Sequence, residues 1–109
     1  MPFEFGDVVP FPFTSQAASK RRPAIVASNR TYNAAEPDVV VMVVTSQLRA
    51  SAALGEVWVQ GWKAAGLLKA SAIKPIFATL EQALVIRQLG ALHAADQEAL
   101  RRVIAQTLG

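Results

Sequence analysis

The densest positive charge in the chain stands directly before an apolar segment. Lys20, Arg21 and Arg22 are consecutive, and Pro23 opens a strand predicted over residues 23–27. A residue that precedes proline is restricted to extended conformations, so we expect the backbone of Arg22 to be held at the entrance of this strand. A guanidinium binds two phosphate oxygens at once and stays charged at any working pH. Arg22 is therefore a candidate phosphate ligand, and a solvated basic loop is the alternative interpretation of the same charges.

A second polar group follows the most apolar segment of the chain. Residues 39–44 are five valines and one methionine, which predicts a strand covered on both faces. Thr45, Ser46 and Gln47 come directly after it. Hydroxyls at a strand end commonly bond to backbone groups of the turn, which is the simpler interpretation of each one alone. A functional interpretation requires a partner, and Arg22 at the start of another strand is the candidate.

Other site chemistries find little support in the residue inventory. The chain has one histidine and no cysteine, and its acidic residues show no ligand spacing, so we expect no metal and no cofactor. The six glycines are scattered, which argues against a glycine-rich phosphate loop. His93 is the only candidate general base. It stands where a helix is predicted to begin, close to Asp96, and a role at the start of that helix is the preferred interpretation.

Charge is distributed unevenly along the chain. The formal net charge is +3, from 11 Lys and Arg against 8 Asp and Glu, and residues 8–35 contain no acidic residue. Clustered cations gain free energy from counterion release on a phosphate backbone, so the first two thirds of the chain favour a polyanion-binding surface. Phe11 and Phe13 are candidate stacking partners for bases, with packing in the core or at a dimer interface as the preferred interpretation.

The elements that must position these residues are short. The pattern predicts a stiff extended segment at residues 10–13 and loops at 14–22 and 29–37. Strands are predicted at 23–27, 39–44, 56–60, 72–76 and 77–80, and an amphipathic helix at 96–108. With no linker or repeat, we expect one domain over residues 1–109, mainly β (α+β), in which a curled sheet is closed by one helix. The absence of a signal peptide and of an apolar run of about 18 residues predicts a cytoplasmic protein without a membrane span.

The chain resembles the MazF/PemK family of type II toxin–antitoxin ribonucleases over nearly its whole length. The resemblance rests on ordered motifs, namely GDVV, PFPFT, SKRRPAIVAS, VVVMVVTSQ, WKAAGLLKASAIKP and RQLGAL. It implies a small SH3-like, partly closed β-barrel with a C-terminal α-helix, acting as a homodimer. It also implies metal-independent cleavage of single-stranded RNA to a 2′,3′-cyclic phosphate, inhibition of translation and growth, and a cognate antitoxin protein that blocks the site.

The family motifs carry residue roles onto this chain. The arginine before the proline, which the family uses in catalysis, falls on Arg22. The catalytic threonine, two residues before the glutamine after the strand, falls on Thr45. The segment at residues 12–21 borders the RNA groove in such proteins. The implied RNA-binding residues are Ser19, Lys20, Arg21, Ser46 and Gln47.

Three other functions remain open from the sequence. CcdB-type toxins share this fold and poison DNA gyrase instead of cleaving RNA. A catalytically inactive relative would bind only RNA or its antitoxin, and a generic RNA-binding barrel would also use a basic, aromatic-containing loop. The pairing of Arg22 with Thr45 favours the ribonuclease over these alternatives.

Overall fold

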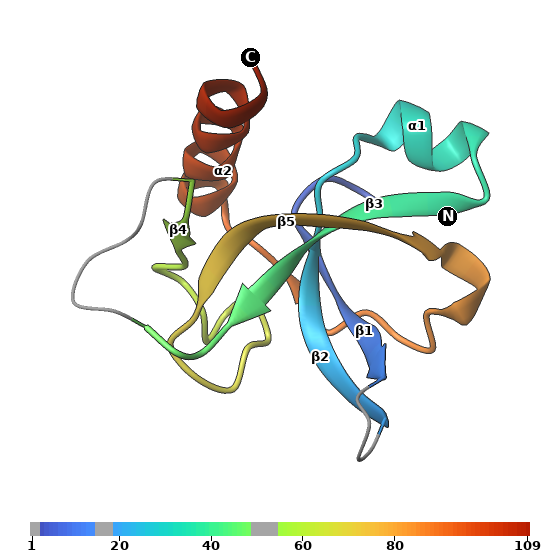
Figure 1. The fold of residues 1–109 in the computed structure, drawn as a ribbon, viewed down its shortest axis with the longest axis horizontal. Helices are drawn as coiled ribbons and strands as arrows, with labels where there is room; N and C mark the ends of the chain where they lie inside the picture. Colours follow the sequence, from blue (N-terminus) through green and yellow to red (C-terminus); the bar gives the residue numbers. More distant parts are fainter. Residues whose placement is uncertain (1–2, 15–18, 49–54) are drawn as a thin grey trace.

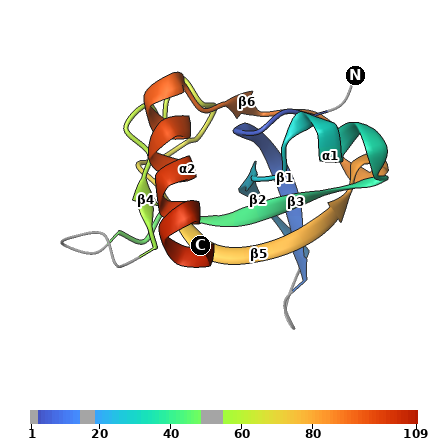
Figure 2. The same ribbon diagram turned by 90° about the horizontal axis from the view of Figure 1, so that it is seen from above.

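The chain folds into one curled antiparallel sheet with a C-terminal helix across it (Figures 1 and 2). The computed structural model describes residues 3–14, 19–48 and 55–109, and for residues 13, 14 and 19–21 it describes the backbone alone. In these ranges the strand order is β4-β5-β3-β2-β1-β6. The predicted fold, a mainly β, partly closed barrel with a C-terminal helix, is confirmed. The strands are β1 (Asp7–Thr14), β2 (Ser19–Val26), β3 (Asp38–Thr45), β4 (Val57–Trp58), β5 (Ala72–Glu81) and β6 (Gly90–Ala91), and the helices are α1 (Arg30–Ala35), the 3₁₀ turn η1 (Gln82–Leu84) and α2 (Ala94–Leu108).

The proline-rich segment is part of a long strand, contrary to the prediction of a stiff connection and a polar loop. β1 pairs with β2 from Val8 opposite Ile25 to Thr14 opposite Ser19. Within this ladder Pro10 faces Pro23, which fits a pair that exchanges no hydrogen bonds, because neither residue has an N–H. Non-bonded pairs recur every second residue, so a proline two positions further along β1 is tolerated as well. Alternating prolines and phenylalanines therefore suit one strand.

β3 forms the centre of the sheet and is covered on both faces, as predicted. Val39 and Val41 pack into one buried cluster, and Met42 and Val44 pack into the other. The pairing with β5 shifts register between Met42 and Val44, opposite the stretch of β5 that contains Pro75. A proline is compatible with an irregular position because it has no N–H to donate. The two predicted strands at residues 72–76 and 77–80 are thus one continuous strand, β5.

Helix α1 occupies a segment that was predicted to be a loop. Its first turn is capped by Asn29, whose side chain accepts a hydrogen bond from the N–H of Tyr32 at 2.9 Å. The helix has six residues, too few to show a hydrophobic period. The strand predicted at residues 56–60 is shorter than expected, since only β4 (Val57–Trp58) is paired.

Helix α2 agrees with the prediction and begins two residues earlier than expected. It covers one face of the curled sheet, with Leu100 fully buried and Val103 and Ile104 against the same cluster (Figure 2). Its apolar stripe therefore closes the core that the β3 side chains Met42 and Val44 share. Among the described residues, no helix combines the length and the hydropathy of a membrane span.

Candidate functional site

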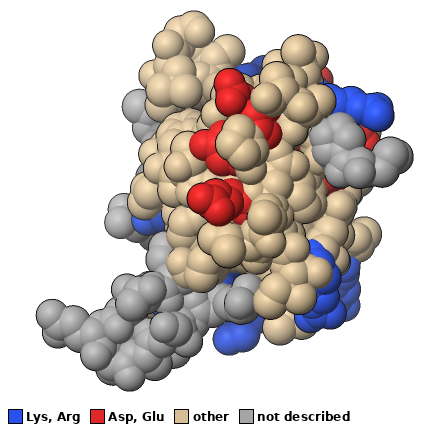
Figure 3. Space-filling view, turned by 90° about the vertical axis from the view of Figure 1, so that its right-hand side faces the viewer, with Lys and Arg blue, Asp and Glu red and all other residues tan. Residues whose placement is uncertain are grey.

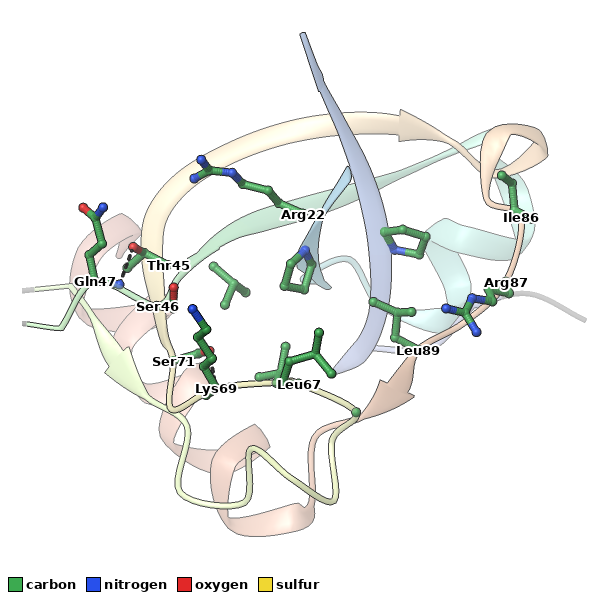
Figure 4. Close-up of a pocket in the computed structure, with 15 residues that line it drawn as sticks. Arg22, Thr45, Ser46, Gln47, Leu67, Lys69, Ser71, Ile86, Arg87 and Leu89 are labelled. Carbon is green, nitrogen blue, oxygen red and sulfur yellow. Dashed lines mark hydrogen bonds between the residues drawn. The ribbon is translucent and has the colours of Figure 1, made fainter. Parts of the chain in front are cut away.

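An open pocket of about 880 Å³ lies where β2 and β3 separate. The pairing of these strands begins at Ala24, opposite Val43. Pro23 has no N–H and cannot extend the ladder, so the residues before it diverge from the end of β3. The pocket is lined by Pro10, by residues 22 and 23 of β2, by residues 44–47 at the end of β3, and by residues 66–69, 71, 86, 87 and 89 of two later segments (Figure 4).

Arg22 lies at this divergence. It was predicted at the entrance of a strand, and it stands instead inside β2, two residues before the portion that pairs with β3. Its side chain is exposed and extends toward the side of the pocket where Thr45, Ser46 and Gln47 lie (Figure 4). Two segments separated by more than twenty positions in the sequence therefore meet at one surface, as the functional interpretation requires.

The hydroxyl of Thr45 is oriented by the turn that follows β3. Its Oγ1 accepts a hydrogen bond from the N–H of Gln47 at 3.1 Å, as the simpler interpretation of the sequence expected. A hydroxyl has one hydrogen and two lone pairs, so this contact leaves the hydrogen available to donate. Thr45 is half-buried, whereas Ser46 and Gln47 are exposed. The turn therefore orients a donor that faces the same pocket as Arg22.

Three of the predicted RNA-binding residues can be placed only through their backbone. Ser19, Lys20 and Arg21 open β2, where they pair with Thr14, Phe13 and Pro12. Their side chains lie outside the described part of the structure, so their roles stay predictions. The backbone does correct the expected loop, because residues 19–21 belong to β2 and continue its pairing with β1.

Lys69 and Arg87 were not among the predicted site residues, yet both line the pocket. Lys69 belongs to the segment after Gly66, and the hydroxyl of Ser71 donates to the Lys69 carbonyl at 2.7 Å. Arg87 lies on the segment between η1 and β6, at the opposite end of the pocket (Figure 4). Each is an isolated cation in the sequence. Only the path of the chain brings them to the pocket that Arg22 lines, so no local pattern identifies them.

The charge around the pocket has one sign. All eight acidic residues of the sequence lie in described segments, and none of them lines the pocket, whereas Arg22, Lys69 and Arg87 do. Acidic residues Asp38 and Glu81 instead face each other where β3 begins and β5 ends, away from Thr45 at the other end of β3. Figure 3 shows acidic side chains gathered in the middle of one face, with Lys and Arg at its edges, including the upper right and the lower right. A pocket lined by cations and partly by apolar side chains concentrates a positive potential.

His93 acts at the start of α2, as preferred in the sequence analysis. Its Nδ1 accepts from the N–H of Ala95 at 3.2 Å, and its Nε2 lies 3.2 Å from Oδ2 of Asp96. The Asp96 carboxylate is buried and also accepts from the N–H groups of Gln60 and Gly61. His93 does not line the pocket. No group of three or more His, Cys, Asp or Glu side chains within the described residues is arranged to hold a metal ion.

The structure describes the side chain of only one of the two aromatic candidates, Phe11. Phe11 packs against the buried cluster of Val9, Ala24 and Val41, which confirms the preferred interpretation of core packing. The side chain of Phe13 lies outside the described residues. The described residues that line the pocket include no aromatic side chain, and Leu67 and Leu89 supply apolar surface there instead.

Comparison with known proteins gives a consistent result. The family model of the PemK-like, MazF-like toxins of type II toxin–antitoxin systems matches residues 4–108. Among solved structures, the MazE–MazF structure from Deinococcus radiodurans has a TM-score of 0.77 at 25% identity, covering 100% of this chain and 98% of that one. An endoribonuclease in complex with its cognate antitoxin, from a mycobacterial species, has a TM-score of 0.78 at 20% identity, covering 97% and 94%. The Mycobacterium tuberculosis toxin MazF-mt6 has a TM-score of 0.69 at 21% identity, covering 99% and 96%. No curated protein gives a significant match.

Proposed function

Because the chain belongs to the PemK-like, MazF-like toxins of type II toxin–antitoxin systems, we propose that it is a metal-independent endoribonuclease that cleaves single-stranded RNA and thereby inhibits translation and growth. One observation carries the proposal. A pocket with no acidic lining residue holds a guanidinium from β2 and an oriented hydroxyl from the end of β3. These are the two positions that the family motifs assign to catalysis, Arg22 and Thr45.

The chemistry follows from the substrate and from these two groups. The ribose 2′-oxygen gives up its proton to solvent and forms a bond to the adjacent phosphorus. The bond to the 5′-oxygen breaks and that oxygen takes up a proton, which leaves a 2′,3′-cyclic phosphate and a free 5′-hydroxyl. Negative charge builds on the phosphoryl oxygens during the attack. A preorganised donor at this charge is worth about 3–4 kcal/mol, and Arg22 is that donor. Thr45, whose oxygen already accepts from Gln47, donates its hydrogen to a phosphoryl oxygen and orients it.

The remaining parts of the proposal concern partners and setting. An antitoxin protein binds the toxin, as the Deinococcus radiodurans and mycobacterial complexes show for those proteins. The chain acts as a homodimer of single domains, residues 1–109, in the cytoplasm. Exposed apolar side chains on and after β5 support a second copy, since Ile76 is 51% exposed and Leu84 is 55% exposed. Ser19, Lys20, Arg21, Ser46 and Gln47 contact the RNA strand around the reacting phosphate.

The test is cleavage of a mixed-sequence single-stranded RNA by the purified protein in EDTA. We expect cuts that end in cyclic phosphate, their loss in Arg22→Ala, and a smaller loss in Thr45→Ala. Arg30→Ala is the matched control, because Arg30 is an exposed cation on α1 that pairs with Glu4 outside the pocket. The DNA strand of the same sequence lacks the 2′-hydroxyl and should stay intact.

Two results would contradict the proposal. If a folded Arg22→Ala variant cleaves at the wild-type rate, the pocket is not the catalytic site. If the folded wild-type protein leaves RNA intact, the proposed ribonuclease activity is wrong. A gyrase inhibition assay then separates a CcdB-like toxin from an inactive RNA-binding or antitoxin-binding relative.

A further inference from the structure

We propose that Lys69 is a further catalytic residue, a second cation that binds the reacting phosphate opposite Arg22. This inference rests on the proposed ribonuclease function and adds a residue that the family motifs on Arg22 and Thr45 do not include. Three observations carry it, namely the direction of the side chain, the charge around it and the support of its backbone.

The Lys69 side chain is directed into the end of the pocket that contains Thr45. It rises from the segment between Gly66 and Ser71 toward the side where Arg22, Thr45 and Ser46 lie (Figure 4). Arg22 approaches the same region from β2, on the other side of the opening. A phosphate that accepts from Thr45 therefore lies between two cations that come from different parts of the chain.

The charge of Lys69 is not matched by an acidic neighbour. Every acidic residue of the chain belongs to a described segment, and none lines this pocket. Lys74, which lies on β5, places its Nζ 3.8 Å from Oε2 of Glu56. By contrast, no ion pair found in the described residues involves Lys69. An ammonium group in a site with apolar walls and no carboxylate attracts an anionic ligand.

The backbone that presents Lys69 is held at several points. The hydroxyl of buried Ser71 donates to the Lys69 carbonyl at 2.7 Å, and the Ser71 carbonyl accepts from the N–H of Val59 at 2.9 Å. At the other end of the segment, Gly66 has a φ of +87° and packs closely against the Leu89 carbonyl. A Cβ on residue 66 would lie 2.2 Å from the Leu89 oxygen. A supported backbone limits the reorganisation that binding requires, which is the condition under which a cation contributes most to catalysis.

Arg87 provides the contrast within the same pocket. It lies at the far end from Thr45, beyond the apolar side chain of Leu89 (Figure 4). Its position suits a neighbouring nucleotide and not the reacting phosphate. Replacement of Arg87 should therefore weaken binding and leave the rate of the bound complex nearly unchanged, whereas replacement of Lys69 should lower that rate.

The experiment compares single-turnover cleavage by Lys69→Ala, Lys69→Arg, Arg87→Ala and Lys63→Ala at saturating protein concentration. Lys63→Ala is the matched control, because it removes the same charge from the same connection between β4 and β5, but Lys63 lies over the Trp62 ring and does not line the pocket. We expect Lys69→Ala to slow cleavage about 100-fold, the effect of removing one donor at a developing oxyanion. Lys69→Arg should recover most of the rate, and Lys63→Ala should match the wild type.

A binding measurement provides a second readout that a purely structural role would not change. The probe is the full-length substrate RNA with 2′-deoxyribose at the mapped cleavage position, so that it can be bound but not cleaved. For a single strand, the slope of log affinity against log salt should fall by about 0.7 in Lys69→Ala, the value for one phosphate contact.

The outcomes separate the two proposals. If the wild type neither binds nor cleaves RNA, the proposed function fails and this inference fails with it. If Arg22→Ala is inactive but folded Lys69→Ala matches Lys63→Ala in rate and salt slope, only the role of Lys69 is wrong. If Lys69→Arg cleaves as slowly as Lys69→Ala, the positive charge at this position does not accelerate the reaction and the proposal is wrong.

Discussion

Asp96 should contribute more to the stability of this fold than any exposed charge on the same helix. Its side chain belongs to the first turn of α2 and is 1% exposed. The carboxylate accepts from the N–H of Gln60 at 3.0 Å and from the N–H of Gly61 at 2.9 Å. These bonds tie the helix to the beginning of the connection between β4 and β5, which also carries Lys69. Substitution by alanine removes both acceptors and leaves two backbone donors without partners.

The size of the effect follows from these bonds. A hydrogen bond to a charged group contributes about 1.5–3 kcal/mol, so the loss of both bonds in Asp96→Ala should lower the free energy of unfolding by about 3–6 kcal/mol. That is a large part of the roughly 5–15 kcal/mol that stabilises a typical domain. Asp96→Asn keeps one acceptor oxygen but directs its NH₂ group at a backbone N–H, so it should recover only part of the loss.

The assay is urea unfolding followed by far-UV circular dichroism at one fixed protein concentration, since self-association would make stability depend on concentration. Glu98→Ala is the control, because Glu98 lies on the same helix with a side chain 64% exposed and pairs with Arg101 at 3.7 Å. An exposed pair of this kind contributes up to about 1 kcal/mol. If Asp96→Ala and Glu98→Ala unfold at the same urea concentration, the buried carboxylate does not hold the segment as argued.

Two further predictions concern the closure of the sheet and the start of β1. Gly90→Ala would place its Cβ 2.2 Å from the backbone oxygen of Ala65, so the two segments must separate, and we expect a loss of about 2–3 kcal/mol in urea unfolding; a variant as stable as the wild type would show that this contact is looser than described. Burial raises the pKa of Asp7 above its ordinary value of 3.8, so ionisation opposes folding at neutral pH and ceases to do so below 3.8. Asp7→Asn should therefore be at least as stable as the wild type at pH 7, with an advantage that shrinks as the pH falls toward 3.8, and an advantage that grows on acidification would contradict the role of burial.

The fold was predictable where a pattern repeats over enough residues. The valine run of β3 and the apolar stripe of α2 each extend over several periods, so both elements were located within two residues of their observed bounds. Helix α1 was missed because six residues give no period and its main marker is the single cap of Asn29. The end of β1 was missed because prolines ordinarily argue against a strand, whereas here Pro10 occupies a position that needs no N–H.

The sequence by itself determined the residue types of this protein and the conformation of its strongly patterned segments. It contains an arginine whose backbone is held extended by the following proline, a hydroxyl at the end of a buried strand and an excess of cations over acids. Each of these features can be recognised from adjacent residues or from composition. Only the tertiary structure decided which of these groups share a site. β2 leaves β3 at Pro23, and Lys69 and Arg87 reach the resulting opening because β5 returns along β3 and β6 pairs with β1. The physical reason is that local patterns report backbone preference and burial, whereas a site depends on strand pairing between positions far apart in the sequence.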